Sequence, residues 1–293
     1  MSFLYNNFLA TFFEKLLEYL YLNFIHNYFI IVILVLILIK AILTPFDIKQ
    51  RESSMKMMKL QPKIDQLKKR YPDPVIQNQK LRELYKKEDV HMMGGCLPAI
   101  LQMIVLIAFF GALQQLAYKE IVKIVATAAA SPGEAVPLQG FLWIRNMWQP
   151  DSGSALVMPT FKEWSRILST VKPEVAATVA NITTEEAYAM VIQPTLAAHS
   201  GFANGWYILP IIQGITMYFS MGYSLSTAAT DDNPMSGPVM KLVMAAMTAW
   251  FCLSANILFT IYWIAMNLLM FVQTFFFKKY FEYKEKKNLQ KAE

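Results

Sequence analysis

The sequence predicts an all-α membrane protein, and three observations support this fold class. Of its 293 residues, 55% are apolar and 14% are aromatic, which is too apolar for an ordinary water-soluble protein. The apolar residues gather in blocks long enough to cross a bilayer as helices. The charged residues, which give the chain a net charge of +6, concentrate between these blocks.

An amphipathic helix is predicted for residues 1–27, lying on the membrane before the first span. Apolar residues at positions 9, 12, 13, 16, 17 and 20 follow the three-four spacing of one helical face. A short extra span is the alternative, but Glu14, Lys15 and Glu18 in the middle of the segment weigh against it. Because no basic leader and no small-residue cleavage site are recognisable, no cleaved signal peptide is predicted.

The first predicted span, residues 28–46, contains one lysine inside a strongly apolar run. A charge at this depth costs several kcal/mol unless it reaches water or a partner. Lys40 lies about 9 Å from the Pro45 end of the span at 1.5 Å per residue, so its ammonium group could snorkel to the interface. The alternative is a functional lysine that faces water or a partner, and the span alone leaves both interpretations open.

Residues 47–91 form the most charged segment of the chain, with basic residues in excess. A turn signal, Tyr71-Pro72-Asp73-Pro74, divides the segment. A narrow apolar seam at three-four spacing lies on each side of the turn, which predicts a helical hairpin standing in water. The seams comprise Leu60, Ile64, Leu67 and Tyr71 on one side and Leu81, Leu84 and Tyr85 on the other.

The rest of the chain is predicted to hold four further spans. Val239–Phe277 is nearly unbroken apolar sequence and would be about 58 Å long as one helix, against a hydrocarbon core of about 30 Å. It must therefore contain two spans, with the bend expected at Ser254-Ala255-Asn256. The expected ranges are 96–117 for span 2, 118–205 for an external segment of short helices and loops, 206–223 for span 3, 224–238 for a loop, 239–255 for span 4, 257–277 for span 5 and 278–293 for a basic tail.

Charge placement predicts the orientation of the chain in the membrane. Five spans put the two termini on opposite sides, and the positive-inside rule assigns the basic hairpin and the lysine-rich tail to the cytoplasm. The N-terminus and the segment 118–205 are then outside. The loop 224–238 carries Asp231 and Asp232 and no basic residue, so it gives this topology no support.

Residue types that carry catalysis or metal binding are sparse in this sequence. Cys96 and Cys252 have no disulfide or metal spacing and are expected to be packing residues. The predicted spans contain no Asp or Glu, and no His, Cys and carboxylate residues cluster at metal or acid–base spacing. We therefore expect no enzymatic activity, no cofactor and no metal. A small-solute transporter or channel is the alternative class, although no internal repeat is evident and only Lys40 lies well inside a span.

Short motifs occur in a fixed order from the hairpin to the last span. The motifs of the hairpin are Ser54-Met55 and Lys59-Leu60-Gln61-Pro62-Lys63. The motifs that lead into span 2 are Leu84-Tyr85-Lys86, Gly94-Gly95-Cys96-Leu97-Pro98 and Gln102-Met103. Later motifs are Phe141-Leu142-Trp143-Ile144, Tyr207-Ile208-Leu209-Pro210-Ile211, Gly214, Thr216-Met217, Tyr262-Trp263-Ile264, Asn267 and Gln273. Together these motifs resemble the YidC/Oxa family of membrane protein insertases, in particular its short, Gram-positive-like bacterial members. The resemblance covers residues 28–118, 137–151 and 206–280.

The resemblance implies both a fold and a function. Members of this family insert other proteins into the membrane, alone or beside the Sec translocon, and their five spans enclose a hydrophilic groove that opens to the cytoplasm. The groove carries a basic residue on the first span, usually arginine, and Lys40 occupies that place here. The resemblance therefore favours a water-facing Lys40. It also implies nascent membrane proteins as substrates and the bacterial plasma membrane as the location.

Partners are expected at the two basic cytosolic segments. The hairpin is expected to meet targeting factors or the Sec translocon, and the tail is expected to contact the ribosome or lipid headgroups. Direct recognition of nucleic acid is not expected, because the basic runs flank membrane spans.

Further polar residues in the spans are candidates for lining the groove. Those of span 3 share one helical face, as do those of span 5, and Gln102 and Trp263 also match the family pattern. Interhelical hydrogen bonding or packing is the alternative role, because polar residues commonly stabilise packed helices. The candidate groove residues are Lys40, Gln102, Gln213, Thr216, Ser220, Thr260, Trp263 and Asn267.

The chain also departs from the family pattern. Met221 stands where glutamine is common, and Asn256 and Leu258 stand where span 5 often opens with proline and glycine. Lysine in place of arginine at position 40 keeps the charge but loses the planar fork of donors. The groove is therefore expected to be positive but less rich in donors. Residues 152–203 form an external insertion relative to short members, with no role assigned from the sequence.

Overall fold

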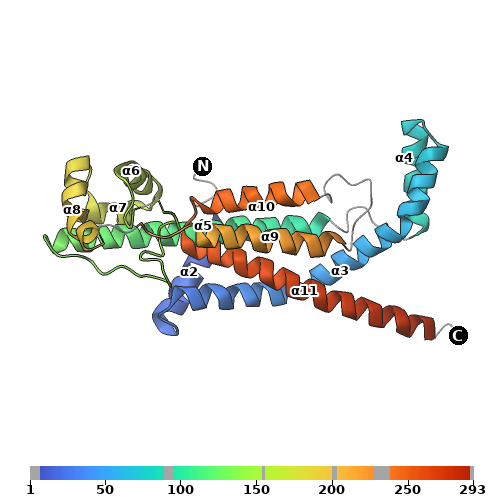
Figure 1. Ribbon diagram of the computed structural model, residues 1–293, viewed down its shortest axis with the longest axis horizontal. Helices are drawn as coiled ribbons and strands as arrows, with labels where there is room; N and C mark the ends of the chain where they lie inside the picture. Colours follow the sequence, from blue (N-terminus) through green and yellow to red (C-terminus); the bar gives the residue numbers. More distant parts are fainter. Residues whose placement is uncertain (1–6, 89–95, 154–155, 200–202, 227–237, 291–293) are drawn as a thin grey trace. The chain divides into compact units, whose positions relative to one another are not determined.

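The computed structural model describes residues 7–88, 96–153, 156–199, 203–226 and 238–290. These residues are mostly helical and contain no β-strand, apart from an isolated bridge between Phe141 and Ile144 (Figure 1). The predicted all-α class is therefore confirmed. Two compact units make up the chain: the first comprises Met1–Leu34, Leu106–Met217 and Ala245–Ala265, and the second comprises Val35–Val105, Tyr218–Met244 and Met266–Glu293. Asp231, Asp232 and most of the predicted loop 224–238 lie outside the described residues.

Apolar helices occur at each predicted span. Among the described residues, three helices are long and apolar enough to cross a membrane, namely Tyr28–Ser53, Ile100–Ala130 and Ile257–Tyr283. Two shorter apolar helical segments, Ile208–Met221 and Pro238–Cys252, coincide with the third and fourth predicted spans. The chain is thus an α-helical membrane protein, and five as the number of crossings stays a prediction.

Helix α3 (Tyr28–Arg70) joins the first predicted span and the first arm of the hairpin in one continuous helix. It passes through Pro45 and Pro62, each of which removes one backbone hydrogen bond from a helix interior. Helix α4 (Pro74–Lys87) begins with Asp73 as its N-cap, whose carboxylate accepts the backbone N–H of Val75 at 2.7 Å. The predicted turn between Tyr71 and Pro74 is therefore the point at which the chain reverses.

The two predicted apolar seams pack against each other in the hairpin of α3 and α4. Near the end of α4, Glu88 pairs with Lys63 of α3 at 2.6 Å, and this ammonium neighbour lowers the pKa of the Glu88 carboxyl. The hairpin is thus closed by a small apolar contact and an exposed ion pair. The packed side chains are Leu60 and Ile64 against Leu81, Leu84 and Tyr85.

Helix α5 (Cys96–Ala130) continues beyond the expected end of span 2 at residue 117. Its later turns bury Ile121, Val125 and Ala128 and are rich in alanine, the best helix former. The helix ends only at Ser131-Pro132-Gly133, where Gly133 adopts a positive φ of 88°. The side chain of Cys96, expected to be a packing residue, lies outside the described part of the structure.

Helices α10 (Pro238–Cys252) and α11 (Ile257–Gln290) are separated at residues 253–256, where the bend was expected. No proline or glycine marks this break; instead Asn256 caps α11 by accepting the backbone N–H of Phe259 at 3.0 Å. The amide of Asn256 also donates to the carbonyl of Leu113 in α5 at 3.4 Å. Cys252, the last residue of α10, is fully buried, as expected of a packing residue. Helix α11 then runs on through most of the predicted basic tail.

The segment that was predicted to be an external insertion folds around its own aromatic contact. Trp164 of α6 (Phe161–Thr170) stacks on Tyr188 of α8 (Glu185–Ala198) with ring centroids 5.1 Å apart. The indole N–H of Trp164 donates to the carbonyl of Ile182, and the hydroxyl of Tyr188 donates to the carbonyl of Pro159. Helices α6, α7 (Pro173–Ala176) and α8 lie close together in Figure 1. The insertion is therefore an ordered part of the first unit.

Helix α2 (Phe8–Asn23) packs a mixed face, Ala10, Glu14 and Leu17, against the rest of the first unit. Glu14 is only 4% exposed and pairs with Lys172 at 3.8 Å, while Glu18 pairs with Lys119 of α5. Burial raises the pKa of the Glu14 carboxyl above its usual range. The opposite stripe of α2 is exposed and apolar, as an interfacial helix requires. The exposed stripe contains Phe8, Phe12, Tyr19 and Leu22.

A buried polar network holds the chain where the segment predicted to be external meets helix α9 (Ile208–Ser226). Asn146 and Asn204, both 0% exposed, are joined by reciprocal hydrogen bonds of 2.8 and 2.9 Å. The carboxylate of Asp151 accepts three backbone N–H groups at the start of α9, from Trp206, Tyr207 and Leu209, at 2.7–3.1 Å. Gly205 is required beside this carboxylate, because a Cβ at that residue would lie 1.9 Å from Asp151 Oδ1.

We predict that Asp151→Ala destabilises the first unit by about 2–4 kcal/mol, because one buried and two partly buried N–H groups would lose their acceptor. The midpoint of thermal unfolding should fall by several degrees. It can be measured as the heat-induced exposure of buried Cys252 to a thiol-reactive dye, in a Cys96→Ser background. Gly205→Ala should have a similar effect by displacing the carboxylate.

Glu174→Ala is the matched control, since Glu174 is an exposed acidic residue in the same external segment. Its effect should stay within about 0.5 kcal/mol. An Asp151→Ala protein that unfolds at the wild-type temperature would show that these hydrogen bonds contribute little.

Candidate functional site

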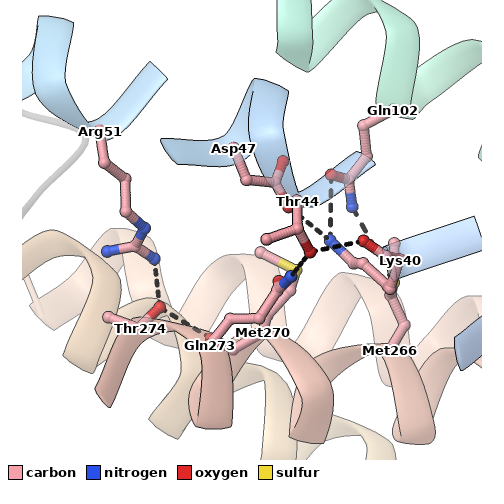
Figure 2. Close-up of polar contacts among 9 residues, drawn as sticks. All are labelled: Lys40, Thr44, Asp47, Arg51, Gln102, Met266, Met270, Gln273 and Thr274. Atoms are coloured by element: carbon pink, nitrogen blue, oxygen red, sulfur yellow. Dashed lines mark hydrogen bonds and ion pairs between the residues drawn. The ribbon is translucent and has the colours of Figure 1, made fainter. Parts of the chain in front are cut away.

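A row of polar side chains follows one face of α3 within the second unit. Lys40, Thr44, Asp47 and Arg51 recur at spacings of four, three and four, which places them above one another on a helix. We call these four residues the polar row. Figure 2 shows the row beside α11, with Gln102 of α5 next to Lys40.

Lys40 is buried within an apolar stretch and is held by two polar groups. Its side chain is 6% exposed, and its ammonium lies 3.3 Å from Oε1 of Gln102 and 3.5 Å from Oδ2 of Asp47. The amide nitrogen of Gln102 lies 4.0 Å from the sulfur of Met266 in α11. The Lys40 charge thus lies beside an amide oxygen and a carboxylate, and the amide is in turn next to the Met266 thioether.

The other members of the row contact α11. The hydroxyl of Thr44 donates to the carbonyl of Lys40 at 2.7 Å and accepts the amide of Gln273 at 3.1 Å. Arg51 hydrogen-bonds the hydroxyl of Thr274, and its guanidinium lies 5.3 Å from the centre of the Phe277 ring. The hydrogen-bond partners of the row on α11 are thus the adjacent residues Gln273 and Thr274 (Figure 2).

The polar row carries a net positive charge, because Lys40 and Arg51 flank the single carboxylate of Asp47. Such an arrangement can bind an anionic group such as a carboxylate. Among the described residues, no three His, Cys, Asp or Glu side chains lie close enough to hold a metal ion.

Among the candidate groove residues, Lys40 of α3 and Gln102 of α5 come from different helices and form a hydrogen bond through their side chains. Ser220 and Asn267 belong to the same unit and are 6% and 3% exposed.

The other four candidates belong to the first unit. Gln213 is fully buried, and the hydroxyl of Thr216 donates to its backbone carbonyl at 3.0 Å. Thr260 donates in the same way to the carbonyl of Asn256 in its own helix, a local bond that needs no partner helix. Trp263 makes an edge contact with Phe259, with ring centroids 5.3 Å apart.

The candidate groove residues did not include Thr44, Asp47 or Arg51. Asp47 and Arg51 fall in the charged segment that was assigned to the hairpin, where a charge ordinarily faces water. The three-four spacing that they share with Lys40 is the signal in the sequence that could have identified them.

The sequence matches the family model described as 60Kd inner membrane protein over residues 19–286, which is most of the chain. The chain belongs to the YidC/Oxa family of membrane protein insertases.

Bacterial relatives named membrane protein insertase YidC align with most of this insertase-family chain. The relative from Clostridium perfringens is 27% identical over 257 residues, covering 85% of this chain and 78% of its own length. The relative from Caldanaerobacter subterraneus is 24% identical over 272 residues, covering 92% and 94%. The relative from Fusobacterium nucleatum is 41% identical over a shorter stretch of 118 residues, covering 39% of this chain and 55% of its own length.

Proposed function

We propose that this chain moves hydrophobic segments of nascent membrane proteins from the cytoplasm into the lipid bilayer, with Lys40 as the charge that attracts acidic residues of the translocated tail. The observation that carries the proposal is a buried lysine inside an apolar helix, enclosed by Gln102 and Asp47. Membership of an insertase family supports the activity. The chain can act alone or with the Sec translocon.

The burial of Lys40 argues against simple snorkelling. A snorkelling lysine exposes its ammonium to water or headgroups at the membrane surface. Here the ammonium contacts protein groups and the side chain is 6% exposed. A cation enclosed in this way costs free energy unless it is paired, and Asp47 supplies the pairing carboxylate in the structure. A carboxylate of a substrate tail is proposed to use the same ammonium.

A hydrophilic groove makes such a charge useful. The polar tail of an inserted protein must cross a hydrocarbon core in which each unpaired polar group costs several kcal/mol. A water-filled groove reaching part of the way shortens the dry path, and a fixed positive charge attracts acidic groups to it. The apolar segment then moves sideways into lipid, and burial of its surface drives the step without nucleotide hydrolysis.

We extend the proposal to the lining of this groove. Lys40 and Gln102 supply its charge and its first hydrogen-bond acceptor, and Ser220 and Asn267 of the same unit are proposed to line it. The candidates from the first unit are proposed on the grounds of sequence pattern. These candidates are Gln213, Thr216, Thr260 and Trp263.

The proposed topology has five spans, with the N-terminus outside and the C-terminus in the cytoplasm. The basic residues of the hairpin and tail support this orientation. On this topology the hairpin is free to meet targeting factors or the Sec translocon, and the tail is free to meet the ribosome or anionic lipid.

Replacing Lys40 by glutamine should slow insertion of a single-span substrate with an acidic tail by about 5- to 30-fold, since a partly screened ion pair is worth about 1–2 kcal/mol. Lys40→Arg should remain active because it keeps the charge. The measurement is the rate of tail translocation into proteoliposomes that contain equal amounts of each variant.

Lys241→Gln provides the matched control, because it removes a lysine from near the end of another apolar helix. Its insertion rate should equal that of the wild-type protein. If Lys40→Gln also inserts at the wild-type rate, the lysine is not the functional charge, and the groove must act through hydration alone.

Deleting Lys284–Glu293 should weaken co-sedimentation with ribosomes and reduce its salt dependence, because binding to a phosphate backbone releases counterions. The deletion removes Lys284, Lys286, Lys287 and Lys291. A variant with these four lysines changed to arginine should bind like the wild-type protein. Unchanged ribosome binding by the deletion variant at low salt would exclude the tail as a ribosome contact.

A further inference from the structure

Asp47 is the acidic group nearest to the functional lysine in the structure. It follows Lys40 by seven residues on α3, two helical turns farther along the same face. Its Oδ2 lies 3.5 Å from the Lys40 ammonium, and the two side chains are 15% and 6% exposed. The pair is therefore largely shielded from solvent.

The contact between Lys40 and Asp47 is a weak one for a buried ion pair. Charge-assisted hydrogen bonds between ammonium and carboxylate groups are usually about 2.7–2.9 Å long. At 3.5 Å the pair lacks hydrogen-bond geometry, and Asp47 Oδ2 is buried without a hydrogen-bond partner among the described residues. An ion pair that serves stability alone is expected to satisfy both of its charges.

The chemistry of Asp47 matches that of the proposed ligand. An acidic residue in the tail of a substrate would present the same carboxylate to the same ammonium. While no substrate is bound, Asp47 holds that ammonium; when an acidic tail arrives, one carboxylate replaces another. The contact between Lys40 and Asp47 is long, and one oxygen of Asp47 lacks a hydrogen-bond partner among the described residues. Asp47 therefore weakens the binding of an acidic tail to Lys40 but does not prevent it.

We propose that Asp47 is an internal competitor that limits how tightly Lys40 holds the acidic residue of a substrate. It acts as a positioning and release residue, since it takes back the ammonium as the tail moves on. This inference rests on the proposed role of Lys40. While Asp47 occupies the Lys40 ammonium, the ammonium cannot bind a substrate, so the apparent affinity for a substrate carboxylate is reduced in proportion to the fraction of time that the ammonium is free. Removing Asp47 should therefore strengthen the capture of acidic tails and of no others.

The test compares two substrates that differ only by Asp or Asn at one position of the translocated tail. A photo-crosslinker in the tail reports capture by the full-length chain in proteoliposomes. We expect Asp47→Asn to raise capture of the Asp tail about three- to tenfold and to slow its release, because the internal state no longer competes. Capture of the Asn tail should not change.

Two further variants make the result specific. Asp65→Asn is the matched control, because it removes an acidic charge from the same helix, where Asp65 accepts a hydrogen bond from Gln61 at 3.1 Å. It should leave the capture of both tails unchanged. In a Lys40→Gln background, Asp47→Asn should no longer alter capture of the Asp tail.

The outcomes separate this inference from the proposed function. If Lys40→Gln abolishes the difference between the tails while Asp47→Asn behaves like the wild-type protein, the role of Asp47 is overturned and that of Lys40 stands. If Lys40→Gln leaves the difference intact, the proposed function fails. If Asp47→Asn and Asp47→Ser both change the capture of the two tails equally, Asp47 is a structural residue and the inference is wrong.

Discussion

The cost of holding one positive charge inside an apolar helix shapes the second unit. Lys40 lies in a stretch whose neighbours are almost all aliphatic, and its ammonium is enclosed by protein groups. Polar neighbours stabilise this charge: Gln102 offers an acceptor, Asp47 offers a counter-charge, and Thr44 links the backbone of Lys40 to α11. Without these neighbours the buried cation would be uncompensated and would destabilise the fold.

One polar cluster in each unit shows a different pattern of hydrogen bonding. In the first unit, Asn146, Asn204 and Asp151 form short hydrogen bonds that satisfy backbone groups at the start of α9. Such a network rigidifies the chain and leaves nothing to exchange. In the second unit, the contact between Lys40 and Asp47 is longer and leaves one carboxylate oxygen unsatisfied. The difference is consistent with a structural task for the first set of groups and ligand exchange for the second.

Features that depend on local periodicity could be predicted from the sequence. The all-α class, the turn at Tyr71–Pro74 and the seams of the hairpin follow from residue spacing, and the structure contains them. The break before α11 was located without a proline or glycine, and Asn256 as an N-cap supplies the physical reason for it. In contrast, α5 runs past its expected end because apolar burial continues along the helix beyond the bilayer-length window.

The site was predicted only in part, because its contacts join distant parts of the chain. Lys40 and Gln102 were both candidates, yet spacing along one helix could not reveal that they touch. Asp47 was missed because it begins a charged segment, where burial is not expected. The sequence places Gln273 and Thr274 near the cytoplasmic end of a span, but their pairing with Thr44 and Arg51 depends on helix packing.

The most direct test of the central claim is reversal of the charge at position 40. The measurement is the relative insertion rate of two single-span substrates, one with an acidic tail and one with a basic tail. It compares Lys40→Glu/Asp47→Asn with Asp47→Asn alone, so that no new carboxylate pair is created. If Lys40 attracts the tail, the single variant prefers the acidic substrate and the double variant prefers the basic one. The same preference in both proteins would contradict a charge-based role for Lys40.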